Sequence, residues 1–179
     1  VLDSQGEPYP GIIFDLVMHY YHNASYLTQS NTENGKNIKG PYIYIPKLET
    51  YEEALLVNDI IQHLESSTNV KGTKITALIE TLPAIFQTQE IIYALRNYMV
   101  GLNCGRWDYL FGYVKNNLKD VEKILPDRRL LNMNTSFMQA YVEEIVSSTH
   151  KRGIHAMGGM SAFIPGKNKE ENIEIMNKI

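Results

Sequence analysis

The sequence predicts an α/β fold in which strands and helices alternate along the chain. Short apolar runs rich in Ile, Val and Leu are followed by longer amphipathic segments. No internal repeat or low-complexity tract interrupts this order. Short apolar strands are typical of a parallel sheet covered on both faces, and helices are the usual connections between parallel strands.

Five apolar runs are the predicted strands. Each is short, as expected for a strand in a parallel sheet. They cover residues 12–16, 42–45, 74–79, 100–103 and 154–157. Residues 31–40, between the first two runs, are polar and contain glycine, so we expect a surface loop there.

Four helices are expected between and after these strands. Residues 51–65 carry apolar side chains at helical spacing, and Thr50 with Glu53 has the spacing of a capping box at their start. Residues 84–98 repeat the pattern, and Pro83 suits the first turn of that helix. The remaining expected helices cover residues 109–118 and 136–151.

This alternation fits two architectures, an open doubly wound sheet and a (β/α)8 barrel. A complete barrel needs about 250 residues. The chain has 179, so a barrel would be partial, with about five of the eight strands. We expect residues 1–179 to form a single domain that is part of such a barrel. An open barrel exposes unpaired strand edges, which predicts self-association.

Composition argues against several classes of function. The formal charge is -3 and the Lys and Arg residues are scattered, so we expect no nucleic acid partner. No apolar run approaches the roughly 20 residues that cross a bilayer, so we expect no membrane partner. Cys104 is the single cysteine, which excludes an internal disulfide and a cysteine zinc cluster. A bound metal would therefore need oxygen or histidine ligands.

Two acidic residues follow neighbouring predicted strands. Glu80 comes directly after residues 74–79, and Asp108 lies just beyond residues 100–103. In both architectures ligands bind at the carboxyl ends of the strands, so both carboxylates should lie on one rim. Mg²⁺ takes oxygen ligands and often only one or two protein carboxylates. The alternative is that each acid caps the helix that follows it, because acids favour helix N-termini.

Residues 105–108 could form an anion site beside this pair. Gly105 can adopt backbone conformations closed to other residues, so the segment could turn sharply and present successive N–H groups to a small carboxylate. An ordinary turn from strand to helix explains the same residues equally well. Trp107 could cover the site or belong to the core.

Three longer strings resemble the signature segments of the malate synthase family, in the form common to plants, fungi and many bacteria. They are IETLPA at residues 79–84, GLNCGRWDY at residues 101–109 and HAMGGMSAFIP at residues 155–165. They stand in the order that the family has. Residues 44–49 and 125–128 resemble further segments, so the similarity runs from about residue 11 to residue 167.

The resemblance implies a magnesium-dependent (β/α)8 barrel of the glyoxylate cycle. Such an enzyme condenses acetyl-CoA with glyoxylate and hydrolyses the thioester to give malate and CoA. Glu80 and Asp108 match the family's magnesium-ligating carboxylates. The substrate-binding candidates by resemblance are Gly105, Arg106, Trp107, Asp108 and Pro165. The implied compartment is the cytoplasm or the peroxisome or glyoxysome.

Some of the family's catalytic residues have no match in this sequence. By resemblance the general base is an aspartate beyond the last matching segment, and a supporting arginine comes from a strand upstream of Val1. The chain begins with Val rather than Met and ends in a helix-like stretch, so we expect a fragment trimmed at both ends. No catalytic residue is therefore assigned.

Two alternatives to malate synthase activity stay open. One is a related magnesium-dependent lyase acting on other CoA thioesters, such as citramalyl-CoA or malyl-CoA lyase, although the long string at residues 101–109 argues against it. The other is a truncated remnant without catalysis. Thiol release from acetyl-CoA with added glyoxylate distinguishes an active chain from such a remnant.

Overall fold

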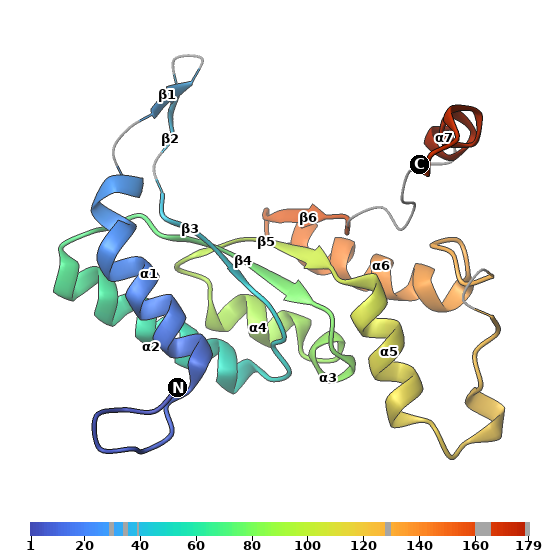
Figure 1. The fold of residues 1–179 in the computed structure, drawn as a ribbon, viewed down its shortest axis with the longest axis horizontal. Coiled ribbons are helices and arrows are strands. Elements are labelled where there is room, and N and C mark those ends of the chain that lie inside the picture. Colours follow the sequence, from blue (N-terminus) through green and yellow to red (C-terminus); the bar gives the residue numbers. More distant parts are fainter. Residues whose placement is uncertain (29–30, 34–35, 39, 128–129, 160–165, 178–179) are drawn as a thin grey trace.

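The computed structural model of the chain describes all residues except 29–30, 34–35, 39, 128–129, 160–165 and 178–179. Its centre is a parallel sheet of four strands in the order β3-β4-β5-β6, so each strand pairs with its neighbour along the chain (Figure 1). The strands are β3 (Tyr42–Ile45), β4 (Lys74–Ile79), β5 (Met99–Cys104) and β6 (His155–Met157). These four match predicted strands, which confirms the α/β class.

The fifth predicted strand, at residues 12–16, is wrong. These residues belong to helix α1 (Gly11–Leu27), whose buried side chains Tyr20 and Ala24 are one helical turn apart. A short apolar run fits a strand or a buried helix equally well, and the helical spacing emerges only over the longer segment. The sheet therefore has four strands among the described residues, where about five were expected.

The polar stretch at residues 31–40 is also more ordered than predicted. It contains the short strands β1 (Asn31–Glu33) and β2 (Lys36–Ile38), which pair antiparallel in a two-stranded sheet of their own. The prediction of a loop there is therefore wrong for these six paired residues.

The predicted helices are present, although one of them is divided. Helix α2 (Tyr51–Thr68) begins with the expected capping box, in which the backbone N–H of Glu53 donates to the Thr50 side chain. The helix expected at residues 84–98 is divided into α3 (Leu82–Ile85) and α4 (Thr88–Ala94). Tight turns cause the break, because the N–H of Gln87 donates to the carbonyl of Ala84. The remaining helical elements are α5 (Arg106–Asn116), η1 (Val121–Lys123), α6 (Ser136–His150) and α7 (Lys169–Met176).

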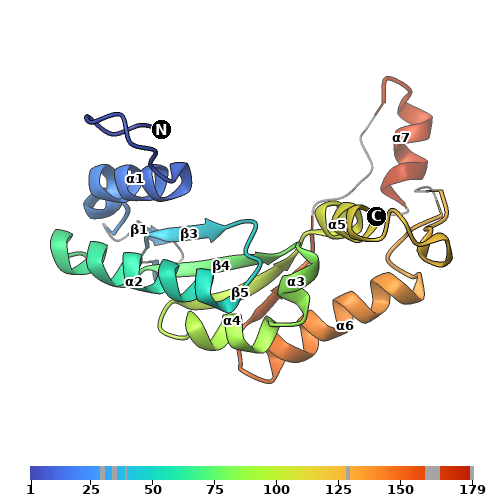
Figure 2. The ribbon, with the colours of Figure 1, turned by 90° about the horizontal axis from the view of Figure 1, so that it is seen from below.

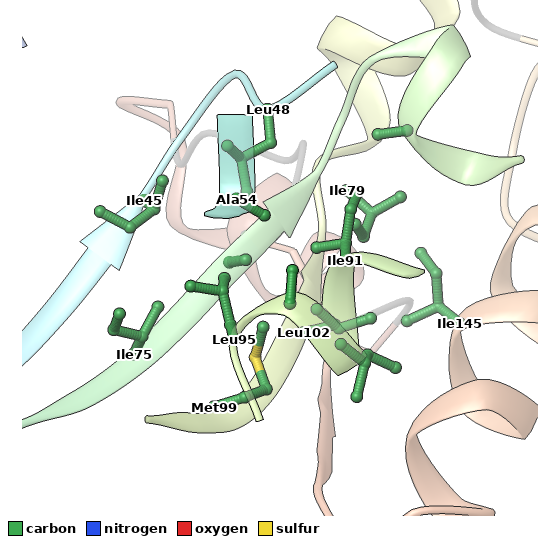
Figure 3. Packing of buried hydrophobic residues seen from close by; sticks show 14 of the residues in the cluster. Ile45, Leu48, Ala54, Ile75, Ile79, Ile91, Leu95, Met99, Leu102 and Ile145 are labelled. Carbon is green, nitrogen blue, oxygen red and sulfur yellow. The ribbon is translucent and has the colours of Figure 1, made fainter. Parts of the chain in front are cut away.

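The core lies between one face of the sheet and a layer of helices. Figure 2 shows α2, α4 and α6 on one side of the sheet and α1 on the other side, over β3. Side chains alternate along β4, so that every second one is fully buried beneath the helices. The buried cluster includes Ile45, Ile75, Ile79, Leu102 and Ile145 (Figure 3). The opposite face is only partly buried in the described residues, so the expected cover on both faces is incomplete.

Among the described residues, no helix combines the length and the apolar character that crossing a bilayer requires.

Leu102 offers a direct test of this core, because it is fully buried on the central strand β5. Replacing Leu102 with Ala should lower the free energy of unfolding by about 2–5 kcal/mol, since the change removes buried apolar groups and leaves a cavity. Urea denaturation followed by circular dichroism measures the loss. Leu55→Ala is the control, because Leu55 is 40% exposed on α2. A loss at Leu102 no larger than that at Leu55 would contradict the packing described.

Candidate metal and substrate site

Glu80 and Asp108 lie at the carboxyl ends of adjacent strands, as predicted. Glu80 directly follows β4, and Asp108 is in the first turn of α5, just after β5. The register pairs Ile79 at the end of β4 with Cys104 at the end of β5. Because the two strands are parallel, both acids reach the same rim of the sheet, where α3 and α5 begin (Figure 1).

Neither acid caps a helix. The cap of α3 is Thr81, whose side chain accepts a hydrogen bond from the N–H of Ala84 at 3.3 Å. The residue before α5 is Gly105, which has no side chain to offer. The alternative interpretation of the acid pair as two helix caps is therefore wrong.

Both carboxylates instead contact Lys47, which follows β3. The Lys47 Nζ lies 2.6 Å from Asp108 Oδ1 and 3.4 Å from Glu80 Oε2. Three consecutive strand ends thus contribute one charged side chain each. Sequence reasoning missed Lys47 as a site residue because only oxygen and histidine side chains were considered as metal ligands. The signal was present, since Lys47 closely follows an apolar strand just as Glu80 does.

Glu80 is held by a second contact that does not depend on the ammonium group. Its side chain is only 3% exposed, and its Oε1 accepts a hydrogen bond of 2.8 Å from the backbone N–H of Lys47. A buried carboxylate is costly unless it is hydrogen-bonded or paired, and this one is both. Lys47 has φ of 59°, which is uncommon for a residue other than glycine. This turn directs both its N–H and its side chain at Glu80.

Lys47 and Asp108 each stabilise the charged form of the other. The hydrogen bond from Lys47 holds the pKa of Asp108 below its ordinary value, and the same bond raises the pKa of Lys47. Both groups are therefore charged at neutral pH. Asp108 and Lys47 are about half exposed, at 53% and 56%, so water screens this pair much more than it screens Glu80.

Gly105 is needed for space rather than for an unusual backbone conformation. Its φ is −91°, which most residues adopt, so of the two alternatives the ordinary turn from strand to helix is correct and the turn through a conformation reserved for glycine is wrong. A Cβ at this position would lie 2.4 Å from the Glu80 Cβ and 3.0 Å from its Oε2. Only a residue without a side chain lets the start of α5 approach the buried acid so closely.

Residues 106–108 form the first turn of α5 beside the acid pair. The first hydrogen bond of this helix runs from the N–H of Tyr109 to the carbonyl of Gly105, so the three preceding N–H groups have no acceptor within the helix. The Arg106 guanidinium lies over the Trp107 ring, 4.5 Å from its centroid. Trp107 is 45% exposed, which makes core packing the wrong interpretation for it.

The loop after β6 packs against the end of β5. The Asn103 side-chain amide donates to the carbonyl of Gly158 at 3.0 Å. A Cβ on Gly159 would lie 2.6 Å from the Cys104 carbonyl oxygen, so this contact also requires glycine. Residues 158–159 therefore reach the same rim as the acids. Pro165, the remaining predicted substrate contact, lies outside the described residues.

Two buried tyrosines, Tyr109 and Tyr141, pack beside the strand end that carries Glu80. The Tyr141 hydroxyl, from α6, donates a hydrogen bond to the carbonyl of Ile79, immediately before Glu80. The Tyr109 ring stacks on Tyr141 with centroids 4.1 Å apart. Sequence reasoning missed Tyr141, whose partner is distant along the chain.

Cys104, at the end of β5, is also buried. Burial raises the pKa of its thiol to about 11, so the thiol is protonated at neutral pH and is not a nucleophile.

This arrangement belongs to the class of parallel α/β proteins, with a candidate site at the carboxyl ends of the strands as in a (β/α)8 barrel. The family model of the malate synthase TIM barrel domain matches residues 1–179. The chain therefore belongs to the malate synthase TIM barrel family, and its four-stranded sheet is part of a barrel, as expected.

Individual relatives agree with this membership. The chain is 43% identical over 177 residues to malate synthase A of Escherichia coli (strain K12), covering 98% of the chain and 32% of that protein. It is 46% identical over 162 residues to glyoxysomal malate synthase of Gossypium hirsutum, covering 89% of the chain and 28% of the relative. The chain thus spans roughly a third of the length of these curated relatives.

A solved structure shows the same fold at low sequence identity. A citrate lyase from Burkholderia xenovorans LB400 has a TM-score of 0.58, covering 91% of the chain and 55% of that protein. The identity is 14%, so this likeness concerns the fold alone.

The close approach at Gly105 yields a prediction for stability. Gly105→Ala should lower the free energy of unfolding by about 1–3 kcal/mol, because its methyl group overlaps Glu80 and forces a shift. Thermal unfolding measures the change.

Gly112→Ala on the same helix is the matched control. Its Cβ would meet nothing nearer than the Leu82 backbone nitrogen at 3.8 Å. Since Ala favours helix over Gly by about 0.5–1 kcal/mol, this variant should be neutral or more stable. Equal effects of the two substitutions would argue against the crowding at Gly105.

Proposed function

We propose that this chain carries the metal-binding and glyoxylate-binding part of a malate synthase, which condenses acetyl-CoA with glyoxylate and hydrolyses the resulting thioester with water to give malate and CoA. The observation that supports it best is the convergence of Glu80 and Asp108 on one cationic group. Membership of the malate synthase family adds the reaction as the natural expectation. The likeness to a citrate lyase concerns the fold alone and gives no support to the lyase alternative.

The donor set fits Mg²⁺. One oxygen each of Glu80 and Asp108 approaches a common point, and Mg²⁺ commonly takes one or two protein carboxylates with water or substrate at its other positions. Within the described residues, no group of three or more His, Cys, Asp and Glu side chains could hold a metal. A centre of two carboxylates therefore suits Mg²⁺ better than Zn²⁺, which usually takes three or four protein ligands.

The bound metal would act as a Lewis acid that polarises the aldehyde of glyoxylate. The chain's own residues would orient the substrate. We assign the glyoxylate carboxylate to the first turn of α5, where the N–H groups of Arg106, Trp107 and Asp108 precede the first helical hydrogen bond. The positive end of the helix dipole favours an anion there. Glu80 would keep its orientation through the Lys47 N–H and the short backbone approach at Gly105.

Formation of the carbon–carbon bond also needs a base that removes a proton from the acetyl methyl group. We assign that base to no described residue of this chain, and Pro165 stays a substrate-binding candidate. The compartment that we propose is the cytoplasm or a peroxisome or glyoxysome; the cotton relative is named a glyoxysomal protein. Self-association through the outer edges of β3 and β6 stays a prediction.

The proposed site predicts a metal-dependent binding event that needs both acids. Glu80→Gln and Asp108→Asn keep the shape of each side chain but remove its negative charge. Each change should abolish glyoxylate binding in the presence of Mg²⁺, because one carboxylate leaves the cation underliganded. Isothermal titration calorimetry with glyoxylate, with and without Mg²⁺, measures the effect.

Asp120→Asn is the matched control for loss of one negative charge. Asp120 pairs with Lys123 at 3.2 Å in a surface ion pair outside this site. This variant should bind glyoxylate like the unmodified chain. Unchanged binding in either the Glu80 or the Asp108 variant would defeat the assignment of that acid.

A further inference from the structure

Lys47 places a positive charge between the two acids, where the proposed function places the metal. Its Nζ is 2.6 Å from Asp108 Oδ1 and 3.4 Å from Glu80 Oε2. We propose that Lys47 is an internal counter-cation that fills the metal position and leaves it when Mg²⁺ binds, so that its ammonium group lowers the metal affinity of the site. This inference rests on the proposed function, which supplies the metal.

The ammonium group and the metal compete for the same oxygens. Mg²⁺ binds oxygen at about 2.0–2.1 Å, so an ion shared by Glu80 and Asp108 would stand close to the point that Nζ holds. Two cations at that separation repel strongly, particularly beside a buried carboxylate where water screens little. Binding of one therefore requires departure of the other.

The exposure and flexibility of the Lys47 side chain allow its ammonium group to move away from the two acids. The side chain is 56% exposed, whereas its partner Glu80 is 3% exposed. A lysine ammonium is compact and strongly hydrated on a flexible stem, so its transfer to water needs no rearrangement of the fold. Its contact with Asp108 is also half exposed and hence weak. The metal can thus displace this group without moving the strands.

The acid pair keeps its arrangement when the ammonium group is absent. Oε1 of Glu80 is held by the backbone N–H of Lys47 at 2.8 Å, and every residue except proline at position 47 keeps that donor. Gly105, the residue before α5, packs against Glu80, and Tyr141 fixes the carbonyl of Ile79 next to it. Lys47→Met therefore removes the charge and keeps most of the length of the side chain while leaving the metal ligands in place.

The proposal predicts opposite changes in two measured quantities. Without the ammonium group the acids repel each other, so metal-free Lys47→Met should melt about 2–4 °C lower. The same variant should bind Mg²⁺ on the order of tenfold more tightly, because no internal cation has to be displaced. Damage to the fold alone would lower both stability and affinity, so the combination identifies displacement.

The experiment is a titration of Mg²⁺ alone into each variant, by isothermal titration calorimetry, with melting followed by circular dichroism. Lys123→Met is the matched control, because Lys123 is similarly exposed, at 51%, and pairs with Asp120 outside the site. It removes one positive charge from the chain and should leave Mg²⁺ affinity unchanged. Lys47→Arg keeps the cation and should bind Mg²⁺ no more tightly than the unmodified chain.

The outcomes separate this inference from the function on which it rests. Tighter binding by Lys47→Met, with no gain for Lys123→Met or Lys47→Arg, supports displacement. Binding by the unmodified chain with equal or weaker binding by Lys47→Met overturns the inference and leaves the metal site intact. A gain shared by Lys123→Met would reduce the effect to net charge and also overturn it. Absence of Mg²⁺ binding in all variants would overturn the proposed metal site itself.

Discussion

The structure of the site depends on one buried carboxylate, Glu80, held at the end of a central strand. Its backbone partner is the N–H of Lys47 from the neighbouring strand end, and its charge partner is the ammonium group of the same residue. Parallel pairing of β3, β4 and β5 is what brings Lys47, Glu80 and Asp108 to one rim. A shift of β4 by a single residue would turn its buried side chains to the other face of the sheet and move Glu80, which directly follows that strand. The register of the strands therefore determines both the packing of the core and the positions of the site residues.

The fold could be predicted from local patterns wherever the apolar residues of a segment repeat with a single clear spacing. The strand at residues 74–79 and the capping box at Thr50 are correct because short apolar runs and capping residues reflect local backbone needs. The error at residues 12–16 arose because a run of five mostly apolar residues fits a strand and a helix equally well. The buried residues Tyr20 and Ala24, one helical turn apart and further along the chain, identify the helix. The break between α3 and α4 follows from turn hydrogen bonds that periodicity does not encode.

The site was predictable in position but not in its contacts. Placing both acids on one rim needed only the rule that ligands bind at the carboxyl ends of parallel strands, and Glu80 and Asp108 obey it. The contact of Lys47 with Glu80 joins residues on different strands, so no local spacing indicates it. The role of Gly105 was misjudged for a related reason, because the crowding comes from Glu80 on the neighbouring strand rather than from its own backbone.

In the proposed site, Glu80 and Asp108 bind a single divalent ion from the same side. A crystal structure with Mn²⁺ in place of Mg²⁺ tests it most directly, because the anomalous signal of manganese locates the ion independently of its ligands. We expect one peak at about 2.0–2.3 Å from one oxygen each of Glu80 and Asp108, with the Lys47 ammonium group moved away. A peak elsewhere, or Lys47 still between the two carboxylates in a crystal saturated with Mn²⁺, would contradict the claim.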